Sequence, residues 1–425
     1  MSKKIYIIFI IIVVLIIALS CVFLIDKKPK NDEVIPIIEP GDNISFDYKI
    51  INETNKRYKN NYMISPLSIA YALSILEVGA TDNTKKEIDK LLNNYNLIND
   101  PNIKDRISLA NALFINNKYK SNIKNLYIDS IKTNYNSDIL FDDFNTPDVI
   151  NNWVNEKTYK MIPRILDSIS NDFVLGIANA IAIDVEWKTK FECNNTRKET
   201  FTLKDGTKMD TAMMYSNSNL TYFENDEAKG IIKDYVSYDK TTGKQTYEEN
   251  ENTVSLEYIA ILPNDIDKFM KNLNKDKIDS LLKNKQTSSS NLTINLKLPK
   301  YTHDFDYDDF KDALQTLGIK DAFDSDKASF NNILKENSDI SIYVDEAIHK
   351  SHIELSENGT KAAAVTAFIL NKATSINHEQ PKIINITFDK PFIYIIKDKI
   401  SDNIWFFGTV YEPLKWEKHT CENKK

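Results

Sequence analysis

The sequence predicts a single domain of the α+β class, and three observations carry this prediction. Hydrophobic residues make up 42% and charged residues 27% of the 425 residues, as in globular proteins with a sizeable core. Segments with strand and helix patterns follow one another from residue 45 to residue 414. Neither an internal repeat nor a linker interrupts them. We therefore expect one mixed domain over residues 45–414, followed by a polar tail at residues 415–425.

The N-terminal segment predicts a membrane anchor. Residues 5–25 are almost wholly apolar and follow a short flank, residues 1–4, that contains two lysines. About 20 apolar residues span a bilayer, whereas the core of a cleaved signal has about 7–15 residues. A signal anchor is therefore favoured, but the small residues before Cys21 leave a secreted protein or a lipoprotein signal as alternatives. Residues 26–44 contain three prolines and predict an extended stalk that holds the domain outside the membrane.

Helices are expected at the start of the domain. An amphipathic helix begins near Ser45, and Ser65 with Pro66 has the order of an N-cap followed by a first helical residue. The helix after Pro66 is apolar nearly all round, so it is expected to be buried until Gly79 ends it. Ser65 lacks the GxSxG elbow of a nucleophile, which favours capping over catalysis. A further short helix is expected over residues 81–92.

Strands dominate the rest of the domain. Apolar runs predict them, and two helices, one with Trp153 on its apolar side and one around Phe310, separate them. A polar loop rich in Tyr, Lys, Glu and Asn joins two further strands between residues 231 and 261. The expected strands cover residues 107–115, 173–185, 384–396 and 404–410. One expected helix lies within residues 148–166 and stops near Pro163, and the other covers residues 310–317.

The segment from Glu357 to Ala367 has an unusual distribution of small residues. Glycine is scarce, with 9 residues among 425, so Gly359 is expected where the backbone needs unusual dihedral angles or a close approach. The residues after it alternate with a period of two. One face carries only small side chains: Thr360, Ala362, Ala364 and Thr366. This pattern predicts a strand that can enter a sheet interior and is not yet in place.

Several motifs, in their order along the chain, resemble those of the serpin family over residues 45–413. NYMISPLSIAYALSILEVGATDNT resembles the family's second helix, and ANAIAIDVEW resembles the strand that ends at the breach tryptophan, here Trp187. IYVDEAIHKSHIELSENGTKAAAVTA resembles the strand leading into the reactive loop, and FDKPFIYII with IWFFGTVYEP resembles the C-terminal strands. The resemblance implies an α+β serpin fold with a large central mixed β-sheet, further sheets, about eight to nine helices and an exposed reactive-site loop.

The resemblance also implies the function. A serpin traps a serine protease as a suicide substrate: the protease attacks a bait bond, forms an acyl-enzyme, and the cut loop inserts into the central sheet. We expect this chain to act in that way as a monomer, without a cofactor and without catalytic activity of its own. A non-inhibitory, serpin-like binding or scaffold protein is the alternative.

The same resemblance assigns residues to the regions that move. The hinge, where insertion starts, is assigned to Glu357, Asn358, Gly359, Thr360, Lys361, Ala362, Ala363, Ala364, Val365 and Thr366. The breach and the shutter, the two regions where the central sheet opens, are assigned to Ser65, Pro66, Asn179, Trp187 and His349.

The family register, counted from Glu357, places the bait bond between Ala373 and Thr374. Alanine at this position suits the small apolar pocket of an elastase-like or subtilisin-like protease. The neighbouring bond, Lys372–Ala373, is the alternative and would suit a trypsin-like pocket with an acidic base. The stretch over residues 374–387 is longer than usual for the family, which loosens the register beyond the bond.

Other chemistry is not indicated by the sequence. His349 and His352 would face opposite ways on a strand, and no cysteine or histidine spacing predicts a metal site. The three cysteines can form at most one pair, and unpaired thiols are favoured. They are Cys21, Cys193 and Cys421. The net charge of −7 is mixed along the chain, so a nucleic-acid partner is not expected.

Overall fold

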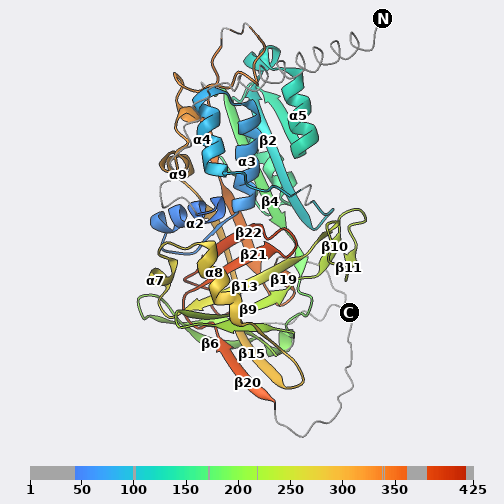
Figure 1. Ribbon diagram of the computed structural model, residues 1–425, viewed down its shortest axis with the longest axis vertical. Helices are drawn as coiled ribbons and strands as arrows, with labels where there is room; N and C mark the ends of the chain where they lie inside the picture. The colour runs from blue at the N-terminus through green and yellow to red at the C-terminus, as the bar shows by residue number, and fades with distance from the viewer. Residues whose placement is uncertain are drawn as a thin grey trace, which may run out of the picture. The chain divides into compact units, whose positions relative to one another are not determined.

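The computed structural model describes residues 44–98, 102–170, 173–217, 219–336, 338, 340–360 and 381–417. The described residues lie in one compact unit that begins at Ile44. They contain eight α-helices and several sheets, which confirms the α+β class (Figure 1). The helices are α2 (Phe46–Arg57), α3 (Pro66–Gly79), α4 (Asp82–Leu92), α5 (Asn125–Tyr135), α6 (Asp148–Lys157), α7 (Ile266–Met270), α8 (Lys275–Leu281) and α9 (Phe310–Thr316).

A large central sheet is built from two four-stranded pieces that share strands end to end. One piece has the order β16 (Tyr301–Asp306), β18 (Lys350–Leu355), β19 (Gly359–Thr360) and β5 (Val185–Glu186). The other has the order β17 (Glu346–Ile348), β4 (Leu175–Ile183), β2 (Ile107–Asn116) and β3 (Ser137–Asp142). Only His349 separates β17 from β18, and only Asp184 separates β4 from β5. Because β2 pairs with β4 antiparallel while β17 pairs with β4 parallel, the predicted mixed sheet is confirmed.

The other sheets lie in the lower half of the molecule in Figure 1, and the seven-stranded sheet packs against the part of the central sheet that contains β18 and β5. The first has seven strands in the order β1 (Tyr62–Ile64), β22 (Ile404–Val410), β21 (Phe392–Asp398), β13 (Leu256–Pro263), β9 (Ala228–Asp234), β8 (Thr221–Glu224) and β14 (Gln286–Thr287). The second has the order β20 (Lys382–Thr387), β15 (Leu292–Pro299), β7 (Lys208–Ser216) and β6 (Arg197–Thr202). The third is small and has the order β11 (Gln245–Thr246), β10 (Ser237–Asp239) and β12 (Thr253–Val254).

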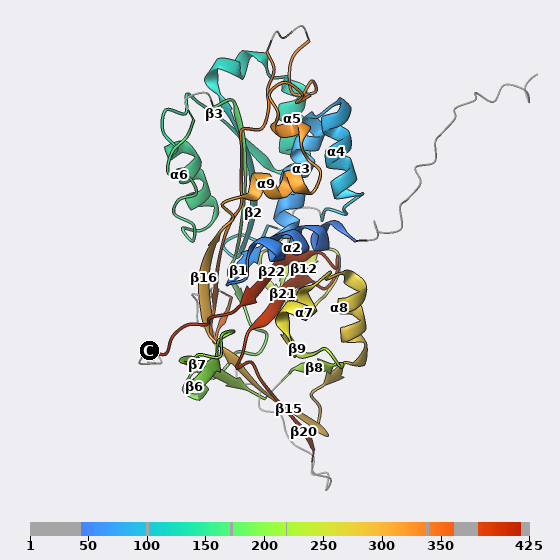
Figure 2. The same ribbon diagram turned by 90° about the vertical axis from the view of Figure 1, so that its left-hand side faces the viewer.

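Helices cover both faces of the central sheet. Figure 2 shows α6 on one side of β2 and the pair α3 and α5 on the other side. The alternation along β2 explains this, because Ala112 and Phe114 pack in the cluster of Trp153 from α6. Leu113 and Ile115 pack on the opposite face, in the cluster that contains α3. The sheet is therefore buried on both faces, which explains why its strands are continuous apolar runs.

The helix α3 lies as the sequence predicts. Its N-cap is Ser65, whose side chain accepts a hydrogen bond from the backbone N–H of Ser68, and Pro66 is its first residue. Most residues around its circumference are buried, and it ends at Gly79. Ser65 is fully buried as a cap, which confirms the capping prediction.

Two predicted boundaries are wrong. The helix expected to stop near Pro163 already ends at Lys157, because Tyr159 and Lys160 take positive φ angles of 52° and 65°. The strand expected over residues 384–396 is two strands, β20 and β21, that belong to different sheets. Pro391 lies between them, and its fixed φ with no N–H donor favours a break in the strand.

Two features of the loops go beyond the expectation. The polar loop between β9 and β13 folds into the small third sheet, which lies at the side of β13 (Figure 1). Cys193 is disulfide-bonded, so the prediction of unpaired thiols is wrong. Both other cysteines of the sequence lie outside the described residues.

The described part of the chain contains no helix that is long and apolar enough to cross a membrane. The predicted anchor at residues 5–25 and the stalk lie outside the described residues.

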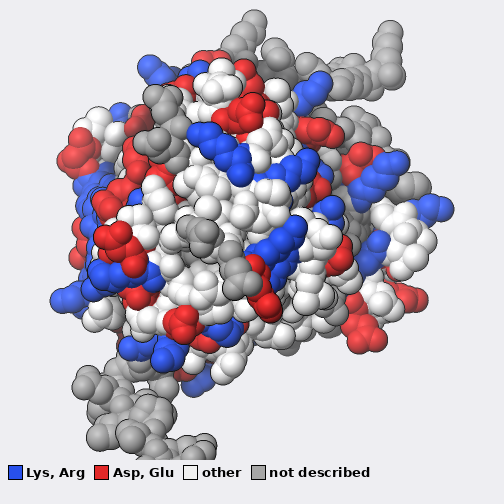
Figure 3. Space-filling model, turned by 90° about the horizontal axis from the view of Figure 1, so that it is seen from above, with Lys and Arg blue, Asp and Glu red and all other residues white. Residues whose placement is uncertain are grey.

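Seen from above, the molecule carries Lys, Arg, Asp and Glu side chains interspersed around an uncharged middle (Figure 3).

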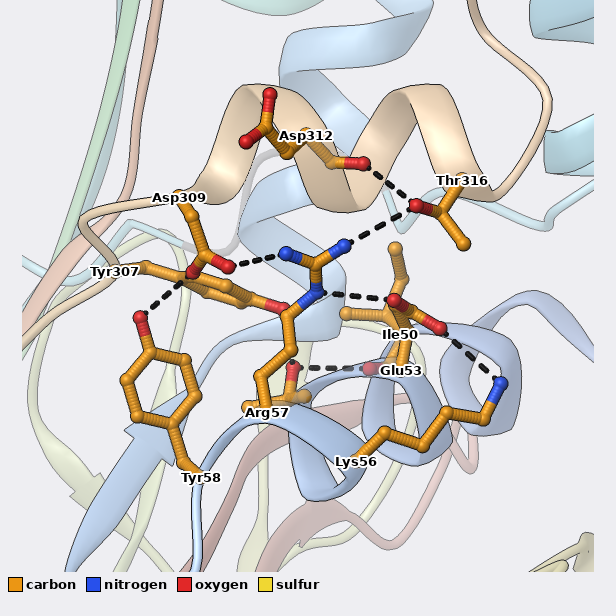
Figure 4. A network of polar contacts seen from close by, with 10 residues as sticks. Ile50, Glu53, Lys56, Arg57, Tyr58, Tyr307, Asp309, Asp312 and Thr316 are labelled. Carbon is orange, nitrogen blue, oxygen red and sulfur yellow. Dashed lines mark hydrogen bonds and ion pairs between the residues drawn. The ribbon is translucent and has the colours of Figure 1, made fainter.

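An ion network joins α2 to α9 (Figure 4). The Arg57 guanidinium donates to Glu53 Oε1 at 2.9 Å and to Thr316 Oγ1 at 3.1 Å, and it pairs with Asp309. The Tyr58 hydroxyl donates to the same Asp309 carboxylate at 2.8 Å. The Glu53 side chain is only 5% exposed. Because an unpaired buried carboxylate destabilises a fold, the ion pair with Arg57 stabilises the folded state.

Arg57→Met is expected to lower the free energy of unfolding by about 1–3 kcal/mol, because the buried Glu53 carboxylate then loses its closest cation. Urea unfolding measures the change. Lys56→Met is the matched control, since the Lys56 side chain meets the same carboxylate but is 72% exposed. Its expected cost is below about 1 kcal/mol, and equal costs for the two variants would contradict the assignment.

Candidate functional site at the opening of the central sheet

The site is the place where β19 enters the central sheet. After β18 the chain turns through Ser356–Asn358 and returns as Gly359–Thr360 between β18 and β5. Thr360 pairs with Leu355 on one side and with Val185 on the other, both antiparallel. Farther along the same strands β17 pairs directly with β4, from Glu346 to Ile348. At one end of the sheet two residues therefore separate β18 from β5, whereas at the other end β17 and β4 pair directly.

This arrangement corrects one expectation. The sequence predicted that the segment after Glu357 is not yet in place, but Gly359 and Thr360 already occupy the sheet. The remaining hinge residues, from Lys361 to Thr366, lie outside the described residues. The residues of both candidate bait bonds, Lys372, Ala373 and Thr374, also lie outside them. The chain is described again from Pro381 and leads into β20.

Gly359 is required by its surroundings. Its φ angle is 156°, which L side chains rarely adopt, and a Cβ atom here would lie 2.0 Å from the backbone oxygen of Val185. Any other residue would push β19 away from β5. The prediction that glycine is placed where the backbone needs unusual dihedral angles or a close approach is confirmed at this position.

Thr360 fits the interior because its hydroxyl group has a partner. The residue is 2% exposed, and its Oγ1 lies 2.6 Å from the Tyr235 hydroxyl. The Tyr235 ring stacks on the Trp187 ring, with centroids 4.4 Å apart and planes 9° apart. A small polar side chain is thus buried without losing a hydrogen bond, and a longer one would meet this aromatic pair.

The turn before β19 is held by Glu357, which is 7% exposed. Its Oε1 accepts a hydrogen bond from Thr196 Oγ1 at 2.7 Å, and its Oε2 lies 2.9 Å from Lys300 Nζ. Burial alone raises the pKa of Glu357, but the hydrogen bonds from Thr196 and Lys300 outweigh it and leave the pKa below its ordinary value. The carboxylate is therefore ionised at neutral pH and joins three distant segments of the chain.

Trp187 holds the same turn through two donors. Its backbone N–H donates to Asn358 O at 2.9 Å, and its indole Nε1–H donates to Ser356 O at 2.9 Å. Phe191 adds a third bond, from its N–H to Glu357 O at 3.0 Å. The sequence assigned Trp187 to this region, and the structure places it in direct contact with the hinge.

The predicted shutter residues lie beside the closed part of the sheet. His349 is 3% exposed and its Nε2 accepts a hydrogen bond from the backbone N–H of Ser65 at 3.2 Å. Burial lowers the pKa of His349 to about 4, so the ring is neutral at neutral pH and can accept. Asn179 is brought to a different partner, because its Nδ2 donates to Asn111 Oδ1 at 2.5 Å on the neighbouring strand β2.

The two histidines of the HKSH motif face different surroundings. His349 is buried against Ser65, whereas the Nδ1 atom of His352 lies 2.6 Å from the exposed Asp304 carboxylate. Among the described residues no group of three or more His, Cys, Asp or Glu side chains could hold a metal ion.

Several residues of the site have no signal in the sequence. Four residues contact Glu357 or Thr360 only because the fold brings them there: Tyr235, Phe191, Thr196 and Lys300. The one local hint is that Lys300 follows Pro299, the last residue of an apolar strand. Their identity as partners of the hinge therefore depends on the tertiary structure.

Comparison with known proteins agrees with this geometry. The model of the family described as "Serpin (serine protease inhibitor)" matches residues 42–413. Human serpin B4 is 27% identical, over 87% of this chain and 98% of the relative. The leukocyte elastase inhibitor of Xenopus tropicalis is 28% identical, over 87% of this chain and 97% of the relative.

A solved structure shares the fold. The thermophilic serpin tengpin in its native state superposes with a TM-score of 0.70 at 28% identity, covering 87% of this chain and 93% of tengpin. With the family model spanning nearly the whole described unit, this chain belongs to the serpin family.

Proposed function

We propose that the protein inhibits serine endopeptidases as a suicide substrate, through cleavage of its reactive loop and insertion of the cut loop into the central sheet. The observation that carries the proposal is the position of Thr360, which already lies between β18 and β5. Insertion would extend this strand from Thr360 toward β17 and β4, and it would displace the pairing between those two strands. The protein itself would act as a monomer and catalyse no reaction.

The residues that follow Thr360 suit such an insertion. The inward positions 362, 364 and 366 are small and uncharged, and Phe368 and Leu370 come next on the same face. Each new hydrogen bond contributes about 0.5–1.5 kcal/mol and each buried large apolar side chain about 1.5–3 kcal/mol. Ordering the backbone costs about 1–2 kcal/mol per residue. Because these terms nearly cancel, the driving force must include release of strain in the intact sheet.

The bait bond points to the class of target. We assign it to Ala373–Thr374, which favours an elastase-like or subtilisin-like protease, with Lys372–Ala373 and a trypsin-like protease as the alternative. A relative that carries the name leukocyte elastase inhibitor supports the first assignment.

Incubation of residues 44–425 with an elastase-like and a trypsin-like protease is expected to give a covalent complex that survives denaturation. Gel electrophoresis and intact mass then identify the complex and the cut bond. Simple cleavage without a complex would instead favour the non-inhibitory binding protein.

The same assay tests the path of the loop. Thr360→Arg is expected to convert the inhibitor into a substrate, because a charge would have to enter the sheet beside Tyr235. Asn358→Arg is the matched control, since the Asn358 side chain is exposed in the turn. An Asn358→Arg protein that still traps protease, beside a Thr360→Arg protein that does not, is the expected pair. Equal inhibition by both would contradict insertion at this position.

We also propose that residues 5–25 anchor the protein in a membrane with the serpin domain on the outer side. The disulfide at Cys193 supports export, because disulfides persist in oxidising compartments. Protease treatment of intact cells is expected to release the domain, with the N-terminal segment retained in the membrane fraction. Full protection of the domain in intact cells would overturn the orientation.

A further inference from the structure

Lys233 is a buried cation outside the residues assigned so far. It lies on β9 and is 1% exposed, and its side chain shares a face of the strand with Ile231 and Tyr235. Lysine is seldom fully buried unless it is paired with an acid. The Lys233 ammonium group donates to a backbone oxygen, and the charged group that acts on its pKa is Asp234, its neighbour in the chain.

The Lys233 ammonium group is held by one segment, Trp187–Phe191. Its Nζ donates to the backbone oxygen of Thr189 at 2.6 Å. It also lies 5.6 Å from the centroid of the Trp187 ring and 4.7 Å from that of the Phe191 ring. One cation therefore binds the middle and both ends of a five-residue segment, by a hydrogen bond and two cation–π contacts.

This segment is the one that holds the hinge turn. Trp187 donates to Ser356 and Asn358, and Phe191 donates to Glu357. Lys233 thus lies behind the residues that fix where the loop enters the sheet.

We propose that Lys233 is a positioning residue for loop insertion, whose ammonium group fixes the segment Trp187–Phe191 and, through it, the register of the hinge turn. This inference rests on the proposed function. Misplacement of the turn would slow insertion, so that more of the acyl-enzyme would hydrolyse and release cleaved inhibitor.

The charge state of Lys233 changes near neutral pH. Burial lowers the pKa of Lys233 to about 7, against a small opposing effect of Asp234. The ammonium form therefore prevails below pH 7 and is lost above it. Because the pKa of Lys233 is lower in the folded state than in the unfolded chain, its burial costs stability, fully below about pH 7 and progressively less as the pH rises toward the ordinary pKa of lysine. An apolar replacement is therefore expected to raise the melting temperature.

Other charged and titratable groups lie on the elements around Lys233. Tyr258 on β13 and Tyr235 have pKa values raised well above 10 by burial, so they stay neutral. On the segment itself, Lys190 is paired with Glu186 at 2.7 Å, and Lys188 donates its backbone N–H to Asp234 O.

The test compares wild type, Lys233→Met, Lys233→Arg and, as a matched control on the same strand, Lys229→Met. The ratio of cleaved to covalently trapped inhibitor is measured with one protease at pH 6 and pH 8.5. At pH 6 Lys233→Met is expected to give a ratio about tenfold higher than wild type, and at pH 8.5 the two should converge. Lys233→Arg should stay at the low ratio across the range, and Lys229→Met should follow wild type.

A structural role alone predicts a different result. Lys233→Met would then melt at a lower temperature than wild type, and its excess ratio would be the same at both pH values. That outcome, or a ratio equal to wild type at pH 6, would overturn the inference.

A second readout separates this inference from the proposed function. If wild type traps no protease, the function fails, and hydrogen exchange of the Trp187 and Phe191 amides decides the role of Lys233. Protection lower in Lys233→Met than in wild type at pH 6, and equal at pH 8.5, supports the positioning role. Equal protection at pH 6 overturns it.

Discussion

The structure depends on a wedge of two residues, Gly359 and Thr360, between β18 and β5. Strands β18 and β5 continue as β17 and β4, which pair directly at the other end of the sheet. One sheet therefore holds a closed and an opened region along a single pair of strands. A further strand could extend from the opened region only if the closed pairing gave way, which is what a loaded conformation requires.

The side chains around Gly359 and Thr360 are polar and buried, and each of those named below has a hydrogen-bonding or ionic partner. Glu357 is bound by Thr196 and Lys300, Thr360 by Tyr235, and the intervening turn by Trp187. Such a network fixes one arrangement of the backbone, because leaving any member unpaired is costly in the interior. The turn is thus a fixed point from which a strand can be laid down in register.

Local patterns in the sequence predicted much of this. The cap at Ser65 and the close approach at Gly359 follow from residue type and order, and both are present in the structure. Trp187 was assigned to this region by the resemblance to the serpin family, and its indole N–H donates to Ser356 O. What failed depends on the fold. The break at Pro391 separates two sheets that one apolar run could not distinguish, and the partners Tyr235, Thr196 and Lys300 come from distant segments. The disulfide at Cys193 has no spacing signal at all.

The most direct test compares the melting temperature of intact protein with that of protein nicked once between residues 361 and 380. If the intact sheet is strained and the cut arm joins it, the nicked protein should melt at least about 10 °C higher. Equal melting temperatures would mean that the cut chain adds no strand to the sheet beyond Thr360. That result would contradict the proposal that the protein traps proteases.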